Sequence, residues 1–139
     1  MAIVHETIQI EADPLRVWEL AGDPARIAEW VPAVASATAE GDERRCALQD
    51  GGELVERIVE RSDAGRFYEY EIVDAPVPLR PYRSRLTVGE HDGYAHVDWV
   101  AEFAPQQAEH ADRLAEAFAA TYRDGLEELR TPIEHGKAA

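Results

Sequence analysis

The sequence has a single cysteine, Cys46, and no apolar run of the length that a membrane-spanning helix needs. One cysteine excludes an intramolecular disulfide and a metal centre built from several cysteines. A helix that crosses a bilayer requires about 20 apolar residues in succession, so membrane insertion is not expected. The opening residues, MAIVHETIQIEADP, carry acidic side chains where a secretory signal has a basic segment and then an apolar one. We therefore expect a cytoplasmic protein.

Basic residues are scarce as well. The 139-residue chain has 14 Lys and Arg against 28 Asp and Glu, which gives a formal net charge of −14 at pH 7. Nucleic acids and anionic lipid surfaces attract proteins mainly through their phosphates, and no basic cluster offsets the acidity here. Binding to nucleic acid is not expected. The length predicts one domain, residues 1–139, with a sizeable core.

Several catalytic and binding signatures are missing. The turn at Gly51 and Gly52 is too short for a phosphate-binding loop and lacks its lysine, and no serine lies in a GxSxG context. The five histidines fall on different predicted elements without the spacing of metal ligands. We therefore expect neither a metal nor another cofactor.

The sequence does contain a strand-rich centre between helical segments. Alternating apolar residues predict a first strand within residues 3–12, and Asp-Pro pairs at Asp13 and Asp23 predict the starts of two short helices. Six further strand-like segments, separated by turns rich in Gly, Asp and Pro, lie within residues 33–103. Apolar residues at three- and four-residue spacing then predict a long helix that ends near residue 130.

This order of elements predicts a curved antiparallel sheet. A sheet of about seven strands curls when its inner face packs on a helix. One helix does not fill the concave side of so large a sheet. Because small-molecule sites are concave and mostly apolar, we expect the remaining space to form a ligand pocket.

Five segments carry a family resemblance, and they are VWELAGDPARIAEWVP, GGELVERIVERSDAGRFYEYEI, VPLRPYRSRLTV, VDWVAEFAP and YRDGLEELR. In this order they resemble the START-like (SRPBCC) superfamily, and within it the bacterial polyketide cyclase/dehydrase-type proteins. The resemblance implies an α+β helix-grip fold like that of the pollen allergens. In that fold a seven-stranded curved antiparallel sheet wraps around a long C-terminal helix, two short helices follow the first strand, and the sheet and helix enclose a ligand cavity.

The middle of the chain also resembles the plant abscisic-acid receptors, which carry an E-R-L motif and a Y-x-S motif. In those receptors the Glu, Tyr and Ser of the two motifs face the hormone cavity. The matching residues here are Glu56, Tyr82 and Ser84. The receptors' lysine for the hormone carboxylate falls near Val31, so the resemblance does not imply that this protein binds abscisic acid.

The orientation of Glu56 is the main question about the predicted pocket. Strand side chains alternate between faces, so an inward Leu54 and Ile58 would bring Glu56 inward with them. The alternative is that Val55 and Val59 point inward and Glu56 pairs with an arginine at the solvent-exposed face, because charged side chains are rarely buried. The resemblance favours the inward orientation.

The same alternation on the other strands, together with the C-terminal helix, predicts the residues that contact a ligand. The expected ligand-binding residues are Leu54, Glu56, Ile58, Tyr68, Tyr70, Ile72, Leu79, Tyr82, Ser84, Trp99, Phe118 and Tyr122. Their tyrosines each offer an apolar ring and a hydroxyl that needs a partner. Trp18 and Trp30 are expected in the core. Gly125, inside the long helix, marks either close packing or space for a ligand.

These features favour a protein that binds a small, largely hydrophobic molecule, such as a lipid, a polyketide or another aromatic or isoprenoid-like metabolite. The first alternative is a cofactor-independent polyketide aromatase/cyclase or dehydratase in which Glu56 transfers the proton. The second is a partner-binding protein whose cavity is incidental. One fold hosts many functions, so the fold does not choose among these. The protein is expected to be a monomer or a homodimer.

Overall fold

The computed structural model describes residues 2–75, 81–104, 109 and 111–134. Along the chain the elements are β1 (Ala2–Ile10), α1 (Pro14–Ala21), the 3₁₀ helix η1 (Pro24–Glu29), β2 (Val34–Glu40), β3 (Glu43–Leu48), β4 (Glu53–Ser62), β5 (Phe67–Asp74), β6 (Tyr82–His91), β7 (Tyr94–Phe103) and α2 (Ala111–Glu134). Over the described residues, the seven strands form one antiparallel sheet in the order β1-β7-β6-β5-β4-β3-β2.

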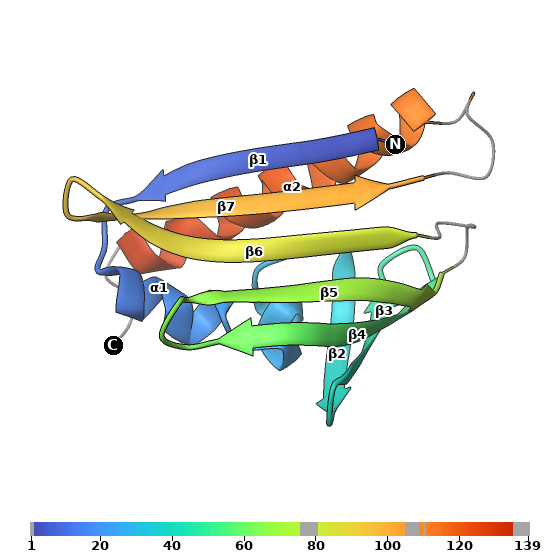
Figure 1. Cartoon of the computed structure of the whole chain (residues 1–139), viewed down its shortest axis with the longest axis horizontal. Coiled ribbons are helices and arrows are strands. Elements are labelled where there is room, and N and C mark those ends of the chain that lie inside the picture. Colours follow the sequence, from blue (N-terminus) through green and yellow to red (C-terminus); the bar gives the residue numbers. More distant parts are fainter. Residues whose placement is uncertain (1, 76–80, 105–108, 110, 135–139) are drawn as a thin grey trace.

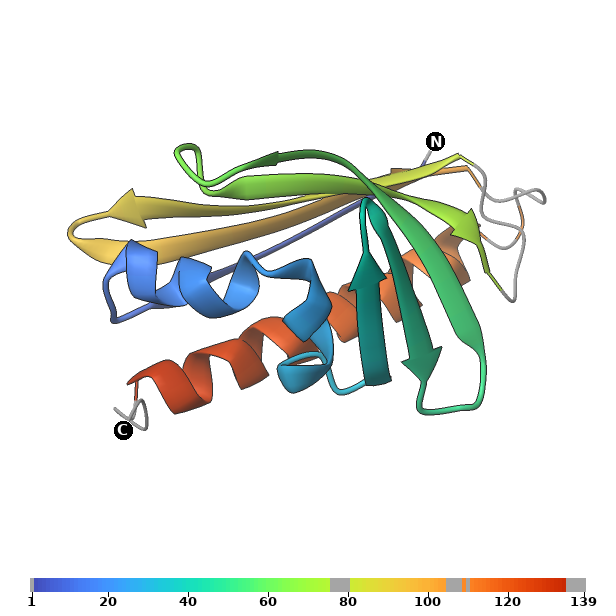
Figure 2. The ribbon, with the colours of Figure 1, turned by 90° about the horizontal axis from the view of Figure 1, so that it is seen from below.

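The sheet curves over a single layer of helices (Figure 1). Figure 2 shows α2 running beneath the sheet, with α1 and η1 on the same side of it. At one end, β2 and β3 turn down beside α2 and close that end of the concave face. The helix-grip fold expected from the sequence is therefore confirmed, with two short helices after the first strand.

Both short helices begin at the predicted Asp-Pro pairs. The carboxylate of Asp13 accepts a hydrogen bond from the Leu15 N–H at 2.8 Å, and that of Asp23 accepts one from the Ala25 N–H at 3.0 Å. The proline that follows each cap occupies the first helical position, where its missing N–H is not needed. The second segment forms a 3₁₀ helix, the tighter form typical of short helical pieces.

Tight turns set the register of the hairpins. Between β6 and β7, Asp92 and Gly93 have φ angles of +52° and +84°. Two successive positive φ values are typical of the type I′ turn, whose twist matches that of the flanking strands. Gly41 and Gly51, with φ of +62° and +96°, lie in the two turns that connect β2 to β3 and β3 to β4. The Gly- and Asp-rich breaks in the sequence thus mark these turns.

The core lies between the inner face of the sheet and α2. Buried and more exposed side chains alternate along β6 and β7, as a half-buried sheet requires. The helix continues about one turn past its predicted end near residue 130, because Leu129 and Ile133 extend its apolar stripe into the core. No helix in the described ranges is both long and apolar enough to cross a bilayer.

Candidate ligand-binding cavity

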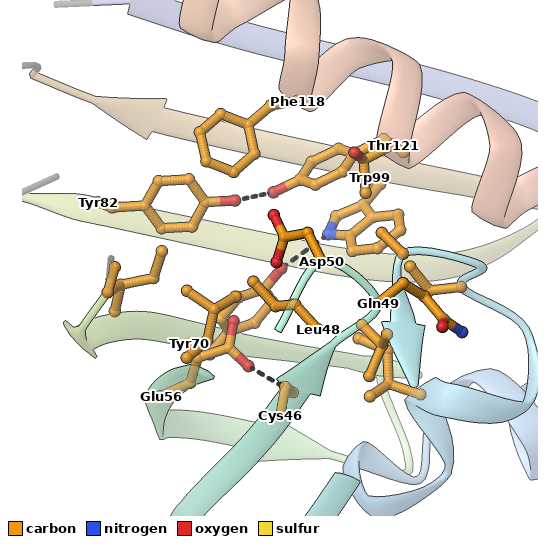
Figure 3. Close-up of a pocket in the computed structure, with 18 residues that line it drawn as sticks. Cys46, Leu48, Gln49, Asp50, Glu56, Tyr70, Tyr82, Trp99, Phe118 and Thr121 are labelled. Atoms are coloured by element: carbon orange, nitrogen blue, oxygen red, sulfur yellow. Dashed lines mark hydrogen bonds between the residues drawn. The ribbon is translucent and has the colours of Figure 1, made fainter. Parts of the chain in front are cut away.

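A cavity of about 410 Å³ lies between the concave face of the sheet and α2. Small-molecule sites commonly have volumes of roughly 300 to 1,000 Å³. Side chains of β3 to β7 line it together with Phe118 and Thr121 of α2 (Figure 3). Most of the wall is aliphatic or aromatic. The exposed residues Gln49 and Asp50 lie at its edge, and they mark the mouth.

The structure brings most of the expected ligand-binding residues to this wall. They are Leu54, Glu56, Tyr70, Ile72, Tyr82, Trp99, Phe118 and Tyr122. Tyr68 and Ser84 are buried but do not line the cavity, and Leu79 lies outside the described residues. Ile58 also lies elsewhere, because it borders a separate depression with Pro24 and Val59.

Ile58 lies beyond the cavity along β4, although its pairing with Tyr70 continues the register of Glu56 with Ile72 and it still packs against the core. The register between β4 and β5 shifts twice, between Val55 and Glu56 and again between Ile58 and Glu60. A bulge bends a strand and increases its twist, so strict alternation does not hold across it. Val55 and Glu56 are consequently both buried although they are neighbours.

Glu56 points inward and pairs with Arg44, which stands directly opposite it in the register of β3 and β4. The Arg44 Nε donates to Glu56 Oε1 at 2.7 Å, and the side chains of Arg44 and Glu56 are 0% and 6% exposed. The two alternatives from the sequence are thus combined. Glu56 pairs with an arginine of the neighbouring strand, as the second alternative has it, but the pair lies at the inner face.

Arg44 is held by several groups at once. Its Nη1 donates to the Pro24 carbonyl and to the Tyr68 hydroxyl, each at 3.1 Å. The guanidinium carbon lies 4.8 Å from the ring centroid of Tyr70, within cation–π range. Burial by itself lowers the pKa of Arg44, but the neighbouring Tyr68 and Glu56 outweigh it and keep this pKa well above its usual value. The cation therefore persists in the interior.

Arg44 is the main residue that the sequence reasoning missed. It alternates with Cys46 and Leu48 along β3, so it shares a face with two residues that line the cavity. That alternation is the signal that could have identified it. Residues around η1 and the start of β2, such as Ile27, Val31 and Val34, also line the cavity and were not predicted.

Cys46 is a second neighbour of Glu56. Its Sγ donates to Glu56 Oε1 at 3.6 Å, the contact drawn as a dashed line in Figure 3. Burial, helped by the nearby charge of Glu56, raises the pKa of the Cys46 thiol to about 12. The thiolate is the reactive form of cysteine, so Cys46 is unreactive near neutral pH.

A group of hydroxyls forms the other polar part of the wall. Tyr82 and Tyr122 are hydrogen-bonded through their hydroxyls, and Ser84 Oγ lies 3.1 Å from the Tyr122 hydroxyl. The indole N–H of Trp99 donates to Ser84 Oγ at 3.0 Å and to the Tyr70 hydroxyl at 3.2 Å. Burial raises the pKa of Tyr70, Tyr82 and Tyr122 well above the usual value. These hydroxyls are therefore neutral at physiological pH.

The remaining predicted aromatic and glycine positions serve packing. Trp18 and Trp30 are 7% and 2% exposed and belong to the core, as expected. A Cβ atom placed on Gly125 would lie 3.2 Å from Val31 Cγ2 and 3.4 Å from the Trp99 ring. Gly125 therefore marks close packing of α2. No group of three His, Cys, Asp or Glu side chains suited to a metal ion is found among the described residues.

Comparison with known proteins adds to this geometry. The family described as "Polyketide cyclase / dehydrase and lipid transport" matches residues 1–134. The protein XoxI from Bacillus cereus is 28% identical, with a TM-score of 0.90 over 100% of both chains. A protein from Thermobifida fusca is 30% identical, with a TM-score of 0.82 over 94% of this chain and 91% of that one.

More distant structures share the fold. A START superfamily protein from Mycobacterium smegmatis has a TM-score of 0.81 at 9% identity, over 97% of this chain and 99% of that one. No curated protein matches the chain. The match over residues 1–134 shows that the chain belongs to the polyketide cyclase / dehydrase and lipid transport family.

Proposed function

We propose that the protein binds a small, largely hydrophobic ligand in the cavity between the sheet and α2. The observation that carries this proposal is the cavity of about 410 Å³, whose wall is mostly apolar and holds only a few polar groups. An apolar wall supplies affinity and a few placed polar groups supply orientation. These polar groups include Glu56 and the hydroxyls of Tyr70, Tyr82, Thr121 and Tyr122, with Gln49 and Asp50 at the mouth.

The surroundings of Glu56 support binding over proton transfer. A general acid or base must gain and lose a proton during each turnover. Protonation of Glu56 would leave the fully buried Arg44 without its counter-ion, and an uncompensated buried charge is strongly unfavourable. A carboxylate held in this way is suited to accept a hydrogen bond from a ligand.

The surface formed by the described residues gives no support to a purely partner-binding role. The large apolar side chains exposed among the described residues are Ile3, Leu15, Val59 and Tyr94. They belong to β1, α1, β4 and β7 respectively. Partner-binding sites commonly show one contiguous apolar patch, whereas single exposed apolar residues are normal on any protein.

Native mass spectrometry of the purified protein, followed by extraction of the bound fraction, tests the proposal. We expect an added mass that disappears on denaturation, or saturable binding of the hydrophobic dye Nile red when no ligand co-purifies. Leu48→Trp fills part of the cavity and should reduce binding several-fold, because Leu48 lines it. Ala47→Trp is the matched control, since Ala47 is the exposed neighbour on the same strand.

Two results would contradict ligand binding in this cavity. One is that neither a co-purified molecule nor Nile red is bound. The other is that Leu48→Trp binds Nile red as well as Ala47→Trp does, which would place the site elsewhere.

A further inference from the structure

We propose that the cavity selects ligands with a hydroxyl or amino head group and rejects carboxylates. The inference rests on the proposed ligand-binding function and adds the chemical class of the ligand's polar end. Three observations lead to it: the charges that face the cavity, the free oxygen of Glu56, and the directions of the hydrogen bonds among the wall hydroxyls.

The charged groups on the cavity wall are all acidic among the described residues. Glu56 lies inside the cavity and Asp50 lies at its mouth, and no described Lys, Arg or His lines it. Arg44 is buried behind the wall, where Glu56, the Pro24 carbonyl and the Tyr68 hydroxyl accept from its Nε and Nη1. Its Nη2 has no partner among the described residues, but it is fully buried and does not reach the cavity. A ligand carboxylate would therefore meet negative charge with no cation on the described wall to pair with.

Only one of the two carboxylate oxygens of Glu56 accepts hydrogen bonds from the described residues. Oε1 accepts from Arg44 Nε at 2.7 Å and from Cys46 Sγ at 3.6 Å. No hydrogen bond to Oε2 is found within the described part of the chain, and Figure 3 shows this second oxygen pointing away from Cys46. The side chain is 6% exposed, so a donor for Oε2 must come from within the cavity. A carboxylate accepts hydrogen bonds and donates none.

The wall hydroxyls have a defined direction. The Val100 carbonyl can only accept, so Ser84 donates its proton there, at 3.0 Å. The contact between Ser84 and Tyr122 then uses the proton of Tyr122. The contact between Tyr122 and Tyr82 in turn uses the proton of Tyr82. The hydroxyls of Tyr82 and Tyr122 are therefore left with lone pairs alone to offer a ligand.

Glu56 Oε2 and the hydroxyls of Tyr82 and Tyr122 thus require donors from the ligand, whereas the hydroxyls of Tyr70 and Thr121 can still donate. A ligand hydroxyl or amine can donate to Glu56 Oε2 or to Tyr82, and a hydroxyl can also accept from any remaining donor. A ligand carboxylate only accepts, and it also meets the like charge of Glu56. Arg44, on the far side of Glu56, offsets part of this repulsion between like charges, and we expect the remainder to lower the affinity for a carboxylate about tenfold.

Displacement of Nile red by three competitors with the same ten-carbon chain tests the selection. We expect 1-decanol to bind most tightly, methyl decanoate more weakly because it has no donor, and decanoate about tenfold or more weaker than 1-decanol at pH 7. Salt at about 0.15 M screens the exposed charges of the acidic protein but not those in the cavity.

Two variants separate the cavity charge from the overall charge. Glu56→Gln removes the charge inside the cavity. The ratio of the affinity for 1-decanol to the affinity for decanoate should therefore fall several-fold. Glu102→Gln removes one exposed charge on β7 and should leave this affinity ratio unchanged. If Glu56→Gln does not fold, Asp50→Asn at the exposed mouth should lower the affinity ratio by a smaller factor.

The outcomes are distinguishable. Binding of decanoate as tight as that of 1-decanol overturns the rejection of carboxylates, and equal binding of methyl decanoate and 1-decanol overturns the need for a donor. Either result leaves the proposed ligand-binding function intact. Failure of Nile red and of all three competitors to bind overturns the proposed function together with this inference.

Discussion

At the scale of single residues, Arg44 and Glu56 form a buried ion pair that connects β3 to β4 behind the cavity. Such a pair adds little net stability, because both charges lose their water when they are buried. Removing one partner is far worse, since the other charge is left without compensation. Arg44 Nη2 already lacks a hydrogen-bond partner within the described chain.

Single replacements in this pair should therefore be more harmful than the double replacement. We expect Arg44→Met and Glu56→Gln each to lower the free energy of unfolding by about 3 to 5 kcal/mol. The double variant should recover much of that loss, because no buried charge remains. Urea denaturation of all four proteins measures the coupling.

The neighbouring exposed pair is the control. Arg45 Nε and Glu43 Oε1 lie 3.0 Å apart, and about half of each side chain is exposed. Exposed pairs contribute about 1 kcal/mol or less, so Arg45→Met and Glu43→Gln should have small, additive effects. If the variants of the exposed pair lost as much unfolding free energy as those of the buried pair, burial would not be the cause of the loss.

At the scale of the elements, two hydrogen bonds connect the last turn of α1 and its cap to the end of β4 and the residue after it. The Trp18 Nε1 at the end of the helix donates to Asp63 Oδ1 at 3.0 Å, and Arg61 Nε donates to the Gly22 carbonyl at 3.1 Å. The indole of Trp18 lies directly against Gly22, where a Cβ atom would come within 2.3 Å of a ring carbon. Gly22 is thus required by the position of the ring.

Substitution of Gly22 should show this requirement. Gly22→Ala forces the indole of Trp18 to move, and overpacking of this kind typically costs about 1 to 3 kcal/mol of stability. Gly89→Ala in β6 is the matched control, because its Cβ atom would have only an ordinary contact, 3.7 Å from the His96 carbonyl. Urea midpoints of the two variants provide the comparison. If Gly89→Ala lost as much stability as Gly22→Ala, the contact with Trp18 would not be the cause of the destabilisation.

At the scale of the whole molecule, one layer of helices covers one curved sheet and leaves the cavity between them. Groups that ionise at alkaline pH are concentrated in this interior. Burial raises the pKa of Cys46 from 9.0 to about 12, and it also raises the pKa of Tyr68, Tyr70, Tyr82 and Tyr122. Ionisation of these groups therefore favours the unfolded chain.

The sign of the resulting pH dependence follows from linkage. A group whose pKa is higher in the folded state contributes stability that is complete below its unfolded pKa and declines as the pH rises above it. Unfolding free energy should thus fall from about pH 9 upward, and at pH 11 Cys46 alone should account for about 2 to 3 kcal/mol. Urea denaturation between pH 7 and pH 11 measures the decline.

Cys46→Ala separates the thiol from the tyrosines. This variant should lose less stability between pH 9 and pH 10 than the unmodified protein, while the decline above pH 10 remains, because the buried tyrosines are unchanged. A stability that stays constant up to pH 11 in the unmodified protein would contradict the burial of these groups.

Much of this architecture can be predicted from local patterns. Asp13 and Asp23 cap the two short helices because a short polar side chain before proline satisfies a free backbone N–H. Asp92 and Gly93 form the hairpin turn because both adopt positive φ. These signals act within a few residues of the chain, so they do not depend on distant contacts.

The details of the candidate site are less predictable for a physical reason. Strict alternation predicts Ile58 on the cavity wall, but Ile58 lies farther along β4, where the register with β5 shifts again, and it borders a separate depression. Arg44 was missed because a charged residue is normally assigned to solvent unless its partner is known. That partner, Glu56, is twelve residues away in the sequence and adjacent only across the sheet.

The sequence by itself determined the family, the order of the strands and helices, and the turns between them, because these depend on local propensity and periodicity. Only the tertiary structure decided that Glu56 pairs inside the protein with Arg44. It also decided that Ser84, Tyr122 and Tyr82 form one directed chain of hydrogen bonds. Alternation states which face a side chain is on, whereas the group that it meets there depends on strand register and on the packing of α2 against the sheet.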